Sequence, residues 1–310
     1  MTKELTQEDI KEHIIHRHEN LLLDSISIPK SEIISGDLSL TINKNDTLNR
    51  SIFLKEHRHG TFVLQTPLLM EILALAAIVV SGKLKENEMV MFAAITNFKA
   101  MKHYDANKTL TGHVKRINAK NNFLKYEGYL KQGNVEIATG GMTAIFTTNT
   151  HTTTPEQTIF EKPAKEGYPI NKKNRHKKED MIIIDTLYIT DNEIISKYTY
   201  PDTHPLTKGH FPNNPIMMGV MQWMSIEDAL CAYLEKTNKT GNHQWSCNAN
   251  LYNQHNHKIA DIKDITLKSW INDSETPNQT EIQSTKRINF RNMVKPNDTI
   301  YTVLTNLRKL

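Results

Sequence analysis

The chain has 310 residues, of which 38% are hydrophobic, so it can bury about two ordinary cores and is expected to be globular. Its two cysteines, Cys231 and Cys247, form no CxxC pair and have no histidine at metal-ligand spacing, which argues against a disulfide framework and a zinc site. The formal charge of +4 is mild and the basic residues lack interleaved aromatics, so nucleic-acid binding is not expected.

Neither a membrane span nor a signal peptide is predicted. The longest apolar run, from Ile72 to Val80, is about half as long as a bilayer crossing requires. Met1 leads into charged residues instead of an apolar core. With only two cysteines, the chain fits a reducing cytoplasm.

Hydrophobic periodicity in the first half predicts a short helix, two strands, one long apolar helix and a strand-rich tail, in that order. These elements cover Ile10 to His16, Asn20 to Ile28, Ser51 to Leu54, Pro67 to Val80 and Thr109 to Ile117.

A connector follows, because residues 151–180 carry no sustained periodicity and are rich in Thr, Pro, Lys and Asn. Its basic run, Asn171 to Lys178, is interpreted as a solvated linker, with attraction of an acidic partner as the alternative. The connector separates a first domain, 1–150, from a second, 181–310.

The second half repeats the order of the first, with two strands, a long apolar helix and a strand-rich tail. These cover Met181 to Ile189, Ile194 to Tyr200, Ile216 to Leu234 and Thr299 to Leu307.

Three correspondences link the halves. An apolar triplet precedes Asp24 and Asp185, a second strand and a long helix follow, and Asn97 to Met101 matches Asn289 to Met293. We interpret the chain as a duplicated α+β fold in which an antiparallel sheet wraps a central helix. The alternative is two α+β domains that share only generic patterning.

The most specific motif is Gly209-His210-Phe211-Pro212-Asn213-Asn214-Pro215-Ile216-Met217-Met218-Gly219-Val220. Two prolines fix a non-helical loop, and Gly219 and Val220 lie near the start of a helix, where backbone N–H groups lack partners. Such a helix end can polarise a carbonyl group, and a histidine facing it suits acid–base chemistry. The plain alternative is a loop histidine that only bonds to backbone.

This motif resembles the active-site loop of the 3-hydroxyacyl-acyl-carrier-protein dehydratases, which have the hotdog fold. The stretch from His16 to Asp24 is similar to the family's N-terminal HRxxxLLxD sequence, and Asn289 to Thr299 adds support. The resemblance implies a double hotdog that converts 3-hydroxyacyl thioesters to trans-2-enoyl thioesters, in fatty-acid or polyketide/polyene-type biosynthesis. It implies no cofactor and an acyl carrier protein or coenzyme A thioester as substrate, and it leaves a homodimer open.

In that family the histidine pairs with a carboxylate fourteen residues downstream, contributed by the other hotdog unit. Fourteen residues after His210 stands Met224, whereas fourteen residues after His57 stands Glu71. The resemblance therefore implies one working site, His210 with Glu71, with Gly219 and Val220 binding the thioester carbonyl. A second site, His57 with Met224, would have decayed.

Other roles stay open. Glu227 or Asp228 could supply an alternative acid, and Glu71 could be a solvent-facing helix residue. The methionine run, Met217, Met218, Met221 and Met224, is interpreted as core or tunnel lining. A surface position is the alternative left open for His16, His18, His57 and His59. Two further function classes are a non-catalytic acyl-thioester-binding protein and a hotdog thioesterase.

Overall fold

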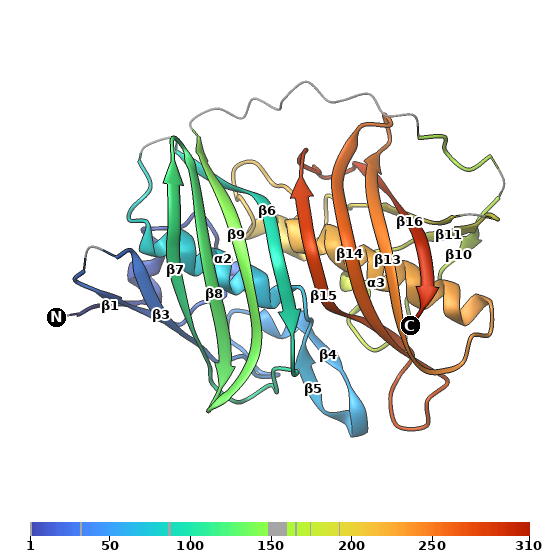
Figure 1. Ribbon diagram of the computed structural model, residues 1–310, viewed down its shortest axis with the longest axis horizontal. Coiled ribbons are helices and arrows are strands. Elements are labelled where there is room, and N and C mark those ends of the chain that lie inside the picture. The colour runs from blue at the N-terminus through green and yellow to red at the C-terminus, as the bar shows by residue number, and fades with distance from the viewer. Residues whose placement is uncertain are drawn as a thin grey trace.

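The computed structural model describes residues 2–31, 33–85, 88–147, 160–164, 166–173, 175–191 and 193–310. Within these ranges the strands form one continuous antiparallel sheet of 14 strands, with a separate two-stranded ribbon. Figure 1 shows the long helices α2 (Leu68–Val80) and α3 (Gly219–Lys236) packed along the sheet, one in each half. The sheet is therefore one unit made of two helix-containing halves.

Of the strands of the large sheet, seven come from the first half, six from the second, and one, at the outer edge, from the predicted connector. The first half contributes, in spatial order, β1 (Thr2–Thr6), β2 (Ser25–Pro29), β3 (Ser35–Leu40), β7 (Leu110–Lys120), β8 (Phe123–Gln132), β9 (Val135–Thr147) and β6 (Met89–Ala100). The second half continues with β15 (Gln279–Phe290), β14 (Lys258–Ile271), β13 (Gly241–Asn253), β16 (Thr299–Lys309), β12 (Ile194–Thr199) and β11 (Thr186–Ile189), and the predicted connector adds β10 (Tyr168–Pro169).

Short elements complete the fold. They are α1 (Gln7–Ile10), the ribbon of β4 (Leu54–Glu56) and β5 (Phe62–Leu64), and the 3-10 turns η1 (His18–Asn20), η2 (Arg50–Phe53), η3 (Arg58–Gly60), η4 (Glu179–Met181) and η5 (Pro205–Lys208).

The two halves meet at the antiparallel pair of β6 and β15, where Ile95 lies opposite Ile288. Every residue of α2 is buried, as expected for a helix that is apolar on all sides. Across the junction, Phe98 packs edge-on against Trp223 of α3 with ring centroids 4.9 Å apart. One hydrophobic core thus runs through both halves.

Matching hydrogen bonds confirm the correspondence around Asp24 and Asp185. The Asp24 carboxylate accepts from the backbone N–H of Thr41 at 2.7 Å, and that of Asp185 accepts from Thr199 at 2.8 Å. Each aspartate opens the same strand pair, β2–β3 or β11–β12. The fold is the predicted double hotdog, with a sheet wrapped around one helix in each half.

The halves differ in the order of their last four strands. By position in the sheet, β6 matches β15 and β7 matches β16, whereas the hairpin β8–β9 matches β13–β14. In the first half that hairpin comes last, but in the second it directly follows the helix. The match between Asn97 to Met101 and Asn289 to Met293 is spatially correct, because each segment ends or follows the strand at the junction. The prediction that the second half repeats the first in the same sequence order is therefore wrong for these strands.

Several predicted boundaries are also wrong. Of the predicted helix over Ile10 to His16, only Ile10 is helical, as the last residue of α1. The predicted first strands start later, at Ser25 and Thr186, because the apolar triplets pack as buried irregular segments. The stretch Ser51 to Leu54 is mostly the turn η2, so β3, not this stretch, is the partner of β12. The second long helix begins at Gly219 instead of Ile216.

Part of the predicted connector packs against the second half. Residues 148–159, 165 and 174 lie outside the described ranges. Phe160 stacks on Tyr252 with ring centroids 4.6 Å apart, and β10 pairs with β11. Lys177 is buried in an ion pair with Asp228 at 2.7 Å, so the interpretation of the basic run as solvated is wrong at this residue.

Both cysteines are buried free thiols. Over the ranges given above, neither long helix has the length and apolar character needed to cross a bilayer.

Candidate active site

His210 lies on the loop between η5 and α3. Its Nδ1–H donates to the carbonyl of Ile216 at 2.8 Å, which leaves the lone pair of the neutral imidazole on Nε2. Phe211 turns the chain sharply with φ 59°, in the left-handed region that non-glycine residues rarely adopt. Such strain is concentrated at functional sites, and here it occurs directly after the histidine.

The first half holds this loop in place. The backbone N–H of Arg17 donates to the carbonyl of Gly209 at 2.9 Å. A Cβ at residue 209 would lie 2.2 Å from the carbonyl oxygen of Arg17, so only glycine permits this approach. The HRxxxLLxD-like stretch therefore supports the motif loop of the other half.

Glu71 is placed opposite His210 by α2. Its side chain is buried, and burial raises its pKa to about 7. The interpretation of Glu71 as a solvent-facing residue is therefore wrong. Burial also lowers the pKa of His210 to about 4. Near neutral pH the site thus combines a neutral imidazole with a carboxyl group that can keep its proton.

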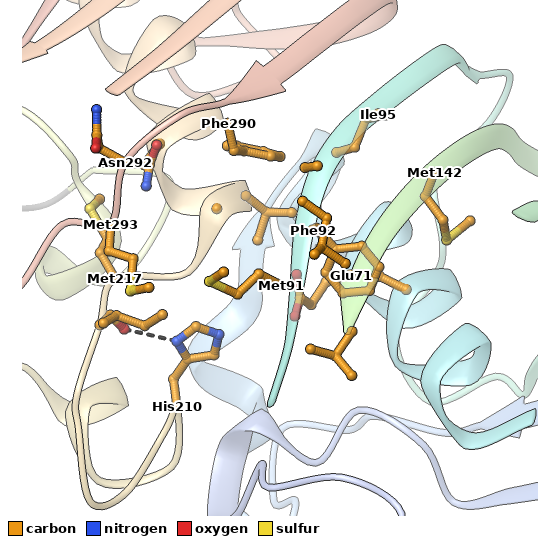
Figure 2. A pocket seen from close by; sticks show the side chains of 18 of the residues that line it. Glu71, Met91, Phe92, Ile95, Met142, His210, Met217, Phe290, Asn292 and Met293 are labelled. Atoms are coloured by element: carbon orange, nitrogen blue, oxygen red, sulfur yellow. Dashed lines mark hydrogen bonds between the residues drawn. The ribbon is translucent and has the colours of Figure 1, made fainter. Parts of the chain in front are cut away.

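A cavity of about 610 Å³ joins these two side chains. Figure 2 shows His210 on one side and Glu71 on the other, with mainly apolar side chains from both halves around them. The lining includes Met91, Phe92, Ile95, Met142, Met217, Phe290 and Met293. This size falls within the usual range of small-molecule sites, roughly 300–1,000 Å³.

Gly219 and Val220 line the cavity at the start of α3, as the motif predicts. The first N–H groups of a helix lack intrahelical acceptors and carry partial positive charge. A Cβ at residue 219 would lie 3.1 Å from the ring of Phe290, so a larger residue would press on the cavity wall. Met217 lines the cavity while Met218, Met221 and Met224 are buried in the core, which confirms both interpretations of the methionine run.

His16 is a third buried group of the site. Its Nε2 lies 4.0 Å from Oε1 of Glu71, and its ring centroid lies 5.0 Å from that of His210. The interpretation of His16 as a surface residue is wrong, because the segment before η1 folds beneath the motif loop. Its position in the HRxxxLLxD-like stretch is the sequence feature that could have predicted it in the site. No sequence feature pointed to Gln222, which lines the cavity with a buried Oε1.

His16, Glu71 and His210 also form a ligand set that suits zinc, since one potential ligand atom of each lies within 4.8 Å of the others. Tetrahedral ligands on a zinc ion are closer, about 3.3 Å apart for bonds of about 2.0 Å. The three side chains would have to move together before they could hold such an ion.

The second position is that of His57 and Met224, the pair expected to form the decayed site. There His57 packs against groups other than those around His210. Its ring centroid lies 4.1 Å from that of His103 and 5.5 Å from that of Trp270. Met224 is buried in the core, so no acid stands at the position that matches Glu71. His57 is also buried, not on the surface; His18 is exposed as predicted, and the side chain of His59 lies outside the described part.

A buried ion pair occupies this second position. Nζ of Lys55 lies 3.1 Å from Oε2 of Glu281, which also bonds to Nε2 of His103 at 2.7 Å. Thr66 donates to Oε1 of Glu281 at 2.6 Å. Lys55 and His103 hold the pKa of Glu281 well below its usual value despite burial. Glu281 is therefore an ionised structural group, unlike Glu71.

The two alternative acids have structural partners. Glu227 accepts from the backbone N–H of Ile282 at 2.8 Å, and Asp228 accepts from Lys177 and from the N–H of Ile183. Burial raises the pKa of Glu227 to about 7, but its carboxylate points to β15. Neither residue lines the cavity that contains His210.

No family model and no curated protein matches the chain. Among solved structures, the dehydratase domain of the CurK module of curacin polyketide synthase aligns over 96% of this chain and 98% of its own, with 12% identity and a TM-score of 0.48. The dehydratase domain of RzxB from Pseudomonas fluorescens aligns over 89% and 99%, with 7% identity and a TM-score of 0.48.

A third similar structure is the dehydratase heterocomplex ApeI:P from Xenorhabdus doucetiae. It aligns over 44% of this chain and 89% of its own, with 16% identity and a TM-score of 0.37.

Proposed function

We propose that this protein is a hydro-lyase that dehydrates 3-hydroxyacyl thioesters to trans-2-enoyl thioesters. The observation that carries the proposal is the buried pair of His210 and Glu71, which two different halves bring to one apolar cavity. An imidazole with a free Nε2 and a carboxyl group that retains its proton are the base and the acid that this elimination requires.

The reaction follows from these two protonation states. His210 Nε2 accepts a proton from C2, and the electrons of that C–H bond form the C2–C3 double bond. Glu71 gives its proton to the C3 hydroxyl group, which leaves as water with the electrons of the C–O bond. N–H groups at Gly219 and Val220 would stabilise the negative charge that develops on the thioester oxygen.

The direct test is to incubate the purified protein with a 3-hydroxybutyryl thioester and to follow enoyl absorbance. Appearance of the trans-2-enoyl product with release of water supports the proposal. Release of free thiol would identify a thioesterase instead, and binding without turnover would identify a non-catalytic binding protein. We propose an acyl-carrier-protein thioester as the natural substrate, and running the assay with coenzyme A and carrier-protein thioesters side by side tests this choice.

The pH dependence of kcat/KM should be bell-shaped. His210 must be neutral, so activity should fall as the pH drops through about 4, where burial has placed its pKa. Glu71 must be protonated, so activity should also fall as the pH rises through about 7. Initial rates at subsaturating substrate across this interval measure both limbs. Activity that keeps rising well above pH 7 would contradict Glu71 as the acid.

A further inference from the structure

His16 lies beside both proposed catalytic groups, although it belongs neither to the motif loop nor to α2. It lies between α1 and η1 and is only 4% exposed. Its Nε2 faces Oε1 of Glu71 at 4.0 Å, while its ring meets those of His210 and Phe211 edge-on, with centroids 5.0 and 5.5 Å away. His16 is therefore next to the proposed acid and next to the loop that carries the proposed base.

The proposed reaction leaves a negative charge on Glu71. Once Glu71 has donated its proton, a buried carboxylate is left in a mostly apolar cavity, where its charge must be stabilised by hydrogen-bond donors or counter-charges. Within the described ranges, the titratable or charged groups around it are His16 and Arg17 of the N-terminal segment, His210 of the loop, and Lys258 and Arg291 of the cavity wall. Arg17 is directed away, since its guanidinium donates to the carbonyls of Lys11, Ile14 and His16.

The two wall cations have other partners. Nε of Arg291 donates to Asp261 at 2.6 Å, and Nζ of Lys258 lies over the ring of Tyr252. His210 has just accepted the substrate proton at this stage, so its imidazolium, within 4.8 Å of the Glu71 carboxylate, supplies a counter-charge. His16 is a further group placed to donate a hydrogen bond to the carboxylate, and it can do so while neutral. Catalytic hydrogen bonds that are long in a ligand-free site commonly tighten when substrate binds.

We propose that His16 is a positioning residue for the reaction: its Nε2–H orients the Glu71 carboxyl group and stabilises the carboxylate that forms when Glu71 donates its proton. The inference rests on the proposed dehydration. A neutral His16 suits this role, and desolvation together with the nearby His210 keeps its pKa well below the usual value. Its other nitrogen, Nδ1, is buried without a hydrogen-bond partner in the described structure, which is a cost in stability that a function would explain.

The test is a comparison of His16→Leu, which fills the space without a donor, His16→Ala and His16→Gln, which keeps an N–H donor. A hydrogen bond to a charged group predicts a loss in kcat of about 10- to 100-fold for His16→Leu and His16→Ala, with KM changed by less than about twofold. Because the lost donor favoured the carboxylate, the alkaline limb should move upward by about one to two pH units. His16→Gln should restore much of both. Assays in the presence of a chelator exclude an effect of bound metal.

Two results would overturn the inference. One is a wild-type kcat and alkaline limb in His16→Leu. The other is an equal loss of kcat in all three folded variants with an unmoved limb, which indicates packing alone. Thermal unfolding checks that each variant folds, and His16→Leu guards against collapse of the cavity left by alanine.

A second readout separates this inference from the proposed function. Infrared difference spectra of the wild type against Glu71→Gln report the protonated carboxyl band of Glu71 without any turnover. Its titration midpoint should be higher in the His16→Leu background. If the wild type fails to dehydrate thioesters but the midpoint moves, the function is wrong and the contact is right. If turnover is normal and the midpoint stays, the inference about His16 is wrong.

Discussion

Replacing His210 with alanine is expected to lower kcat by about 10²- to 10⁴-fold, because the base that removes the C2 proton is lost. Glu71→Gln should produce a loss of similar size, since the amide keeps the shape of the carboxyl group but cannot release its proton. The double variant should be little worse than either single variant, because residues that act as one unit are strongly non-additive. Steady-state kinetics with one thioester substrate measures all three.

His57→Ala and Glu227→Gln are matched controls for these variants. Like His210 and Glu71, they are a buried histidine and a buried carboxyl group. His57, however, packs against His103 at the second position, and Glu227 bonds to β15. Variants that fold should keep kcat within about threefold of the wild type, because substitutions of structural residues outside the active site act mainly on stability. Full activity in Glu71→Gln together with loss in Glu227→Gln would move the acid to Glu227.

Replacing Lys55 with methionine is expected to destabilise the fold by about 3–5 kcal/mol, because the Glu281 carboxylate would stay buried without its main counter-charge. Both side chains of this pair are at most 2% exposed. The free energy of unfolding from urea denaturation measures the loss. The pair stabilises the fold above the pKa of an unfolded glutamate and ceases to do so as the pH falls toward the depressed folded value, so the difference should shrink in acid.

Lys83→Met provides the control for this prediction. Lys83 forms an ion pair with Glu12 on the surface, where the two side chains are 61% and 58% exposed. An exposed pair contributes roughly 0–1 kcal/mol, so this variant should unfold close to the wild type. Equal midpoints for Lys55→Met and Lys83→Met would show that the buried pair contributes no more than a surface pair.

Local features were predictable from sequence. The apolar run of α2 predicted a buried helix with almost its observed bounds, because periodicity and apolar content decide such an element locally. The prolines and Gly219 predicted a fixed loop that leads into a helix, and β7 and β16 were found near their observed positions. The paired aspartates Asp24 and Asp185 correctly related the two halves, since each accepts the same kind of hydrogen bond from a backbone N–H further along the chain.

Long-range packing was harder to predict. The second strand of the first half was assigned to Ser51 to Leu54, because a short apolar run does not reveal whether it is a strand or a turn. The different strand orders of the halves are equally invisible in sequence, since β8–β9 and β13–β14 are local hairpins that can occupy the same place in a sheet from different points in the chain.

The sequence by itself determined the two long helices, the strands β7, β12 and β16, the correspondence of Asp24 with Asp185, and the motif loop of His210. It named Glu71 as the partner only through a family resemblance. The tertiary structure decided that His210, Glu71 and His16 share one cavity, and that Lys55 and Glu281 occupy the opposite position. The reason is physical: hydrophobic patterning specifies which face of an element is buried, whereas a site is defined by which distant elements meet there and by the desolvation that shifts their pKa values.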